Sequence, residues 1–148
     1  MALQIPDCSA CELCAELEAS VNGVIVERRQ TATAIVPRRT RTPGSLIVVA
    51  NRHVMSFNEL QSAEIQDIAL LTWTLSGIVM KTFDAAGLNV WWAFGVLAGQ
   101  TTAHLIVEMV PRFPDVPYKY VDFSDVPEVT LSTRLQVARK LRDSLPLR

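Results

Sequence analysis

Residues 99–112 constrain the fold of this chain more than any other segment, because a turn is followed there by strict alternation of side chains. The segment reads GQTTAHLIVEMVPR. Alternation is typical of a β-strand, in which successive side chains point to opposite faces of a sheet. One face of the strand carries His104 and Glu108, so we expect the chemistry of the protein there. The opposite face is apolar and is expected to pack into a core: it carries Leu105, Val107 and Met109.

Four further segments have the sequence patterns of strands. Residues 24–28 and 31–35 are rich in β-branched side chains and predict a hairpin, and the apolar run at 45–50 predicts a central strand. Residues 88–94 are expected to form the strand that leads into the turn. Together with the helices described next, this order predicts an α+β fold with helices on one face of an antiparallel sheet.

Apolar residues at three- and four-residue steps predict a long helix that Ser62 caps and Gly87 ends. A second apolar stripe predicts a last helix, which Ser132 would cap. The basic side chains of this last helix, Arg134 among them, are expected mostly to face solvent.

Length and charge narrow the class of protein. The chain has 148 residues, which predicts a single domain over 1–148 with a sizeable core. Its net charge of -1 gives no basic field, so we expect neither nucleic acid nor a membrane surface as a partner. The uncharged stretch 85–103 is interrupted by glycines, which disfavours a membrane span. Residues 1–7 lack the features of a signal peptide, so a cytoplasmic location is expected.

The three cysteines occur in one short motif, CSACELC, at Cys8, Cys11 and Cys14. In a chain expected to be cytoplasmic, such cysteines are reduced thiols or metal ligands. Each C-x-x-C spacing is half of a tetrahedral zinc site and needs two more ligands. The only histidines of the sequence, His53 and His104, would complete a four-ligand set. The spacing alone leaves open whether Cys8 or Cys14 pairs with Cys11.

These motifs resemble those of the histidine-triad (HIT) family of nucleotide hydrolases and transferases, over residues 11–112. The family signature is a Gly-Gln-Ser/Thr loop, three histidines at alternate strand positions, and often Pro-Arg. This chain has the loop at 99–101, the first histidine at His104, and Pro111-Arg112. The resemblance implies a HIT-like fold with a five-stranded antiparallel sheet, a long helix, a short N-terminal helix and a two-fold homodimer. Residues 113–148 would form a C-terminal extension with a helix.

The resemblance also implies zinc as a cofactor. HIT-like bacterial proteins often bind it through an N-terminal C-x-x-C pair, a histidine after the third strand and the first histidine of the triad. Matched residue by residue, these ligands are Cys11, Cys14, His53 and His104. Four protein ligands leave no open position on zinc, so this would be a structural site.

The chain departs from the family pattern at the centre of the site. The middle histidine, which is the nucleophile of the family, is replaced by Ile106, and the third histidine is replaced by Glu108. An isoleucine side chain has no lone pair and cannot form a covalent intermediate. Pro37 stands where the family has a ribose-binding aspartate, Ala93 where it has a phosphate-contacting asparagine, and Trp91 near a position of small residues.

Two functions follow as hypotheses. The first is a zinc-stabilised, non-catalytic homodimer that binds a purine nucleotide, another small phosphate ligand or a partner. The second is a nucleotide phosphohydrolase with an altered mechanism, in which Glu108 acts as a general base on water. The candidate ligand-binding residues are Gly99, Gln100, Thr101 and Asn89.

Two alternatives concern charged side chains near this site. Glu108 would either accept a hydrogen bond from a zinc-bound histidine or pair with Arg112 or with an arginine of residues 38–41. The three arginines of residues 38–41 would either hold an anion by charge-assisted hydrogen bonds or form a solvated loop.

Overall fold

The computed structural model of the chain describes residues 2–7, 9–19, 23–116 and 126–146. Cys8 and residues 117–125 of the expected C-terminal extension lie outside the described residues. Two short 3₁₀ helices, η1 (Phe57–Glu59) and η2 (Val96–Ala98), precede α2 and follow β4. The main elements follow one another as α1 (Glu12–Ala19), β1 (Ile25–Arg28), β2 (Ala32–Ile35), β3 (Leu46–Ala50), α2 (Ser62–Phe83), β4 (Gly87–Trp92), β5 (Ile106–Arg112) and α3 (Leu131–Asp143).

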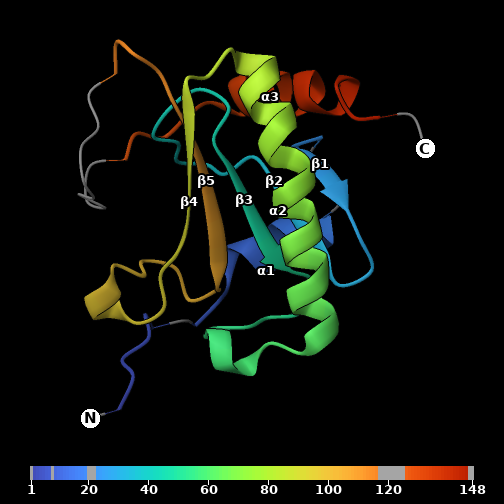
Figure 1. The fold of residues 1–148 in the computed structure, drawn as a ribbon. Coiled ribbons are helices and arrows are strands. Elements are labelled where there is room, and N and C mark those ends of the chain that lie inside the picture. The colour runs from blue at the N-terminus through green and yellow to red at the C-terminus, as the bar shows by residue number, and fades with distance from the viewer. Residues whose placement is uncertain (1, 8, 20–22, 117–125, 147–148) are drawn as a thin grey trace.

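The strands form one five-stranded antiparallel sheet in the order β1-β2-β3-β5-β4 (Figure 1). This arrangement confirms the predicted α+β class and the antiparallel sheet. β5, which comes from the alternating segment, lies between β3 and β4. Its register places Val107 opposite Val48 of β3 and Glu108 opposite Trp91 of β4. β4 forms one edge of the sheet.

The main core lies between the sheet and α2, which runs across the front of the sheet in Figure 1. Leu105, Val107 and Met109 all belong to this core, as the alternation predicts. α3 adds Ala138 and Leu141 to the same apolar cluster. Within the part of the chain that the structure describes, no helix is both long enough and apolar enough to cross a membrane.

A second, smaller apolar cluster lies on the opposite face of the sheet, where α1 packs. Leu17 of α1 contributes to it together with Ile47 and Val49 of β3. The expectation that all helices share one face is therefore wrong for α1. The physical reason is that every residue of β3 is buried, so this strand needs apolar cover on both faces.

The ends of α2 differ from the predicted ones. Ser62 is the first helical residue and Gln61 is the N-cap, because Gln61 and Glu64 form a capping box. The backbone N–H of Gln61 donates to Oε2 of Glu64 at 2.8 Å. Asp84, in the left-handed conformation with a φ of 52°, ends the helix. Gly87 instead opens β4.

α3 also differs from its prediction in two respects. Thr130 is the N-cap and accepts a hydrogen bond from a backbone N–H, whereas Ser132 lies inside the helix. Arg134 is buried and does not face solvent. It lies one turn before Ala138 and two turns before Leu141, so it falls on the stripe that faces the protein interior.

Candidate functional site

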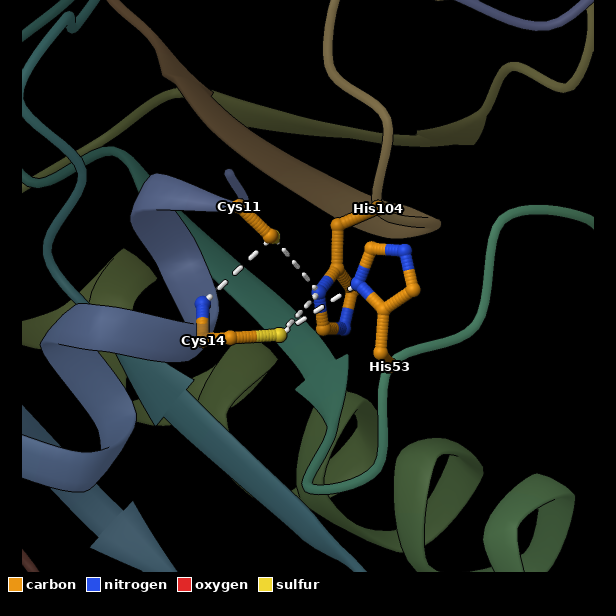
Figure 2. Close-up of side chains that lie close together, drawn as sticks. All are labelled: Cys11, Cys14, His53 and His104. Atoms are coloured by element: carbon orange, nitrogen blue, oxygen red, sulfur yellow. Dashed lines mark hydrogen bonds between the residues drawn. The ribbon is translucent and has the colours of Figure 1, made fainter. Parts of the chain in front are cut away.

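Four side chains from distant parts of the sequence converge beside α1 (Figure 2). They are Cys11, Cys14, His53 and His104, and their ligand atoms all lie within 4.8 Å of one another. Sγ of Cys14 lies 3.3 Å from Nδ1 of His53 and 3.6 Å from Nδ1 of His104. Sγ of Cys11 lies 3.5 Å from Nδ1 of His104. The structure thus brings together the four residues that the resemblance implied as ligands.

The spacing of these atoms fits a tetrahedral metal centre. With metal–sulfur and metal–nitrogen distances near 2.3 and 2.0–2.1 Å, tetrahedral zinc places a sulfur and a nitrogen ligand about 3.6 Å apart. The three sulfur–nitrogen distances, 3.3, 3.5 and 3.6 Å, are close to that value. Two thiolates and two imidazoles are also a common ligand set for structural zinc. The cluster can therefore hold a metal ion.

The start of α1 places both sulfurs on one side of the helix. Cys11 precedes the first helical residue, and Cys14 lies three positions later, so the two side chains are neighbours on the helix surface. The backbone N–H of Cys14 donates to Sγ of Cys11 at 3.5 Å. His53 follows β3 and its ring meets that of His104 edge to face, at a centroid distance of 5.3 Å.

His104 is fully buried and held in one orientation. Its Nε2 lies 3.2 Å from the carbonyl oxygen of Ala50, which can only accept, so Nε2 carries the proton. Nδ1 of the neutral ring is then a free lone pair directed at the cysteines. Burial lowers the pKa of His104; the hydrogen bond to Ala50 acts in the opposite direction and the charge of His53 in the same one. A neutral imidazole is the form that binds a metal.

A pocket of about 750 Å³ adjoins the metal ligands. Cys11 and His104 line it, and so does Ile106, the residue that the resemblance matches to the nucleophilic histidine. The other departures from the family pattern, Pro37, Trp91 and Ala93, also lie in its wall. The residues singled out from the sequence as altered therefore surround a single cavity.

Glu108 lies in the wall of this pocket and is held by two donors. Nε of Arg41 donates to its Oε1 at 3.2 Å, and Nε1 of Trp91 donates to its Oε2 at 2.9 Å. The Arg41 guanidinium also lies 5.7 Å from the centroid of the Trp91 ring. Of the partners considered for Glu108, the structure therefore shows an arginine of the 38–41 loop.

The 99–101 loop lines the pocket as expected, but its residues differ in what they offer a ligand. Gly99 adopts a φ of 87°, which suits glycine. Gln100 is buried and is used within the protein: its Oε1 accepts from Gly95 N–H at 2.7 Å, and its Nε2 donates to the Met55 carbonyl at 2.9 Å. Thr101 is exposed at the pocket. Gln100 thus shapes the loop, and Thr101 is the side chain free to meet a ligand from that side.

Asn89 occupies a different position from the other candidate ligand-binding residues. It lies on β4 opposite Val110, and its Oδ1 accepts a hydrogen bond from Nε of Arg112 at 2.7 Å. Asn89 does not line the pocket. The structure assigns it a role in joining β4 to β5.

The three arginines of residues 38–41 differ in exposure and in partner. The side chain of Arg39 is 64% exposed and pairs with Glu128, as expected of a solvated loop. The side chain of Arg41 is only 14% exposed and pairs with Glu108. Arg38 is largely exposed but reaches Oε1 of the buried Glu16 at 2.9 Å.

Sequence reasoning missed a buried ion pair between α1 and α3, formed by Glu16 and Arg134. The helical pattern of α1 and α3 could have indicated this pair. Glu16 lies between the inward-facing Leu13 and Leu17, and Arg134 shares the buried stripe of α3. An acidic residue on the buried face of one helix and a basic residue on the buried face of another indicate a buried ion pair, because a buried charge needs a partner.

The chain is similar in sequence to known proteins. A family model described as HIT domain matches residues 18–115. Bis(5'-nucleosyl)-tetraphosphatase [asymmetrical] of Schizosaccharomyces pombe is 29% identical over 105 residues, which cover 71% of this chain and 54% of that protein. An uncharacterized HIT-like protein of Mycoplasma genitalium is 24% identical over 71% of this chain and 74% of its own length. The chain thus spans about half the length of the Schizosaccharomyces pombe protein.

Solved structures share the fold at low sequence identity. A Hit-like protein from Bartonella henselae superposes with a TM-score of 0.77 at 16% identity, covering 97% of this chain and 100% of that one. A Zn-bound histidine triad family protein from Mycobacterium smegmatis superposes with a TM-score of 0.74 at 19% identity, covering 91% and 92% of the two chains.

Proposed function

Because the chain belongs to the HIT domain family, we propose that it is a zinc-stabilised, non-catalytic member that binds a nucleotide or another small phosphate ligand as a homodimer. The observation that carries this proposal is the position of Ile106. Its hydrocarbon side chain lines the pocket where the family resemblance places a nucleophilic histidine. Without a lone pair at this point, no covalent nucleotidyl intermediate can form.

The arrangement around Glu108 favours this proposal over the alternative of a hydrolase with Glu108 as general base. A general base must present a carboxylate oxygen to the attacking water within hydrogen-bond distance. Both oxygens of Glu108 already accept hydrogen bonds, one from Arg41 and one from Trp91. Each oxygen keeps a second lone pair, but the two donors hold the carboxylate against the pocket wall and not toward a water at its centre.

The chemistry of the four ligands supports zinc as the metal. Cys11, Cys14, His53 and His104 would hold the ion, and thiolate with imidazole is a donor set typical of zinc. A metal held in this way supplies stability, because it ties α1 to the end of β3 and to β5. The Zn-bound fold neighbour from Mycobacterium smegmatis is consistent with this choice.

The nature of the ligand is inferred from the pocket and from one relative. Gly99 and Thr101 lie in a loop at the pocket, and such loops bind phosphates through backbone N–H groups and hydroxyls. The Schizosaccharomyces pombe relative is a bis(5'-nucleosyl)-tetraphosphatase. We therefore propose a purine nucleotide or another small phosphate as the ligand, bound without turnover, in a reducing compartment such as the cytoplasm.

The edge of the sheet supports a homodimer. β4 is an edge strand, and Val90 at its centre is 42% exposed. An exposed apolar edge strand offers unpaired backbone groups to another strand. Pairing of two β4 edges about a two-fold axis would join two sheets into one, which is the dimer that the family resemblance implies.

Metal analysis and ligand titration test the proposal together. We expect the purified protein to contain about one zinc ion per chain and to bind AMP, measured by calorimetry. Ala93→Trp should fill the pocket and abolish the binding of AMP. Trp73→Ala, which alters an exposed side chain on the far face, is the matched control. Absence of zinc refutes the metal centre, and AMP binding that Ala93→Trp leaves unchanged refutes the assignment of the pocket.

A further inference from the structure

α1 and α3, which lie far apart in the sequence, are joined through one buried ion pair. Nη1 and Nη2 of Arg134 donate to the two carboxylate oxygens of Glu16 at 2.9 and 3.0 Å. Nε and Nη2 of Arg134 also donate to the carbonyl oxygen of Val36 at 3.0 and 2.7 Å. Glu16 is 6% exposed and Arg134 is 5% exposed. This bidentate geometry requires a guanidinium, because a lysine ammonium cannot match both carboxylate oxygens.

α1 depends on this pair because it has few other attachments to the protein. It is eight residues long, and only Glu16 and Leu17 are buried. A helix of this length is not stable alone in water, so tertiary contacts determine where it sits. Besides the ion pair, Leu17 packs in the smaller apolar cluster, and its carbonyl accepts a hydrogen bond from Arg28 at 2.7 Å.

The same helix carries half of the metal centre. Cys11 directly precedes the helix and Cys14 lies in its first turn, whereas His53 follows β3 and His104 precedes β5. The separation between the sulfurs and the nitrogens is therefore set by the way α1 docks. Glu16 lies two residues after Cys14, so a shift of Glu16 would move the sulfurs directly.

We propose that Arg134 is a positioning residue for the metal centre: by holding Glu16, it fixes α1 so that both cysteine sulfurs face the two histidines. This inference rests on the proposed metal site. Both members of the pair lie outside residues 18–115, the segment that the HIT domain model matches. α3 thus serves as a structural part of the metal centre, although it supplies no ligand.

Removal of the guanidinium should loosen the ligand set. Arg134→Met keeps most of the side-chain volume but leaves Glu16 with only Arg38, whose side chain is 57% exposed. A buried carboxylate that loses its main partner moves toward water, and α1 would move with it. Loss of an outer-shell partner typically weakens metal binding about 10–100-fold. We expect a fall near the lower end, because Glu16 does not contact a ligand atom directly.

The test is a competition titration of zinc between the protein and a chromophoric chelator, under conditions in which circular dichroism shows each variant to be folded. Arg134→Met should bind zinc about tenfold more weakly than the wild type. Arg134→Lys, which keeps the charge but not the fork, should fall between them and serves if Arg134→Met does not fold. Arg139→Met is the matched control, because Arg139 is an exposed arginine on the same helix.

A second readout separates this inference from the metal proposal itself. Amide hydrogen exchange of residues 12–19 in the metal-free protein should be faster in Arg134→Met than in Arg139→Met. If the wild type binds no zinc, the proposed metal centre fails, and the exchange rates still report whether Arg134 holds α1. Zinc affinity within twofold of the wild type in folded Arg134→Met, or unchanged exchange in α1, overturns the positioning role.

Discussion

Trp91 and Glu108 lie directly opposite each other on neighbouring strands, and the indole Nε1 donates a 2.9 Å hydrogen bond to Oε2 of the carboxylate. Both side chains line the pocket, and the resemblance matches Glu108 to the third histidine of the family. Arg41 holds the other carboxylate oxygen, so three side chains close this side of the cavity together. A network of this kind stabilises the pocket wall.

The first prediction concerns the stability that this network provides. Glu108→Gln removes the charge that Arg41 faces, and we expect a loss of about 1–3 kcal/mol in the free energy of unfolding, measured with urea. The matched control is Glu128→Gln. It breaks an Arg–Glu pair in which both side chains are largely exposed, so its cost should stay below about 1 kcal/mol. Equal costs for the two variants would show that Glu108 is not held as described.

The second prediction concerns the metal ligands. Cys14→Ser should release zinc, because a serine hydroxyl is a poor substitute for a thiolate ligand. The melting temperature should fall by about 10 °C, since a ligand at 1,000 times its Kd contributes about 4 kcal/mol. Cys8→Ser should leave both zinc content and melting temperature unchanged. Retention of zinc by Cys14→Ser, with loss in Cys8→Ser, would mean that Cys8 pairs with Cys11.

The third prediction concerns acid sensitivity of the metal-free protein. Burial holds the pKa of His104 below its usual value of 6.5, so the unfolded chain takes up a proton at a higher pH than the folded chain. This contribution to stability is therefore fully present above about pH 7.5 and declines as the pH falls through 6.5 toward the folded pKa. Urea midpoints at a series of pH values between 8 and 5 measure it.

A control variant isolates the contribution of His104. His104→Gln keeps a polar side chain but does not titrate, so the fall in stability below pH 7 should be smaller than in the wild type. The buried carboxylate of Glu16 does not account for a fall in stability between pH 7 and 5. Burial alone would raise the pKa of Glu16, but its hydrogen bonds and charge interactions with Arg134 and Arg38 hold it below 4.5. Identical pH profiles for both proteins would contradict the assignment.

The fourth prediction concerns assembly. Val90→Lys places a charge on the exposed edge of β4, and charged edge strands resist pairing. We expect the wild type to sediment as a dimer and Val90→Lys to sediment as a monomer. Leu131→Lys is the control, because it places the same charge at an exposed leucine of α3. A wild type that is monomeric at all concentrations would refute the dimer.

Much of the fold could be predicted from sequence because its strands carry clear period-two patterns. Leu105, Val107 and Met109 occupy the core face that the alternation predicts. The ends of the helices were less predictable, because several residues at each end are able to cap. Gln61 and Thr130 cap α2 and α3, although Ser62 and Ser132 have better-known capping side chains.

The candidate site divides in the same way. The C-x-x-C spacing indicated a metal site and the family resemblance implied its four ligands, which the structure places within reach of one ion. Asn89 was proposed to bind a ligand, but its side chain accepts a hydrogen bond from Arg112 and does not line the pocket. The sequence predicts a surface position for Arg134, because arginines are rarely buried, and its bonds to Glu16 and to the Val36 carbonyl explain its burial.

The absence of catalysis can be tested by incubating a bis(5'-nucleosyl) tetraphosphate with the purified zinc-loaded protein and following the products by chromatography. Ile106→His, Glu108→Gln and the control Glu128→Gln are assayed beside the wild type. We predict no turnover by the wild type, with or without the Glu108 substitution, and any gain confined to Ile106→His. Robust turnover by the wild type that Glu108→Gln abolishes and Glu128→Gln preserves would contradict it and make the protein a hydrolase with Glu108 as its base.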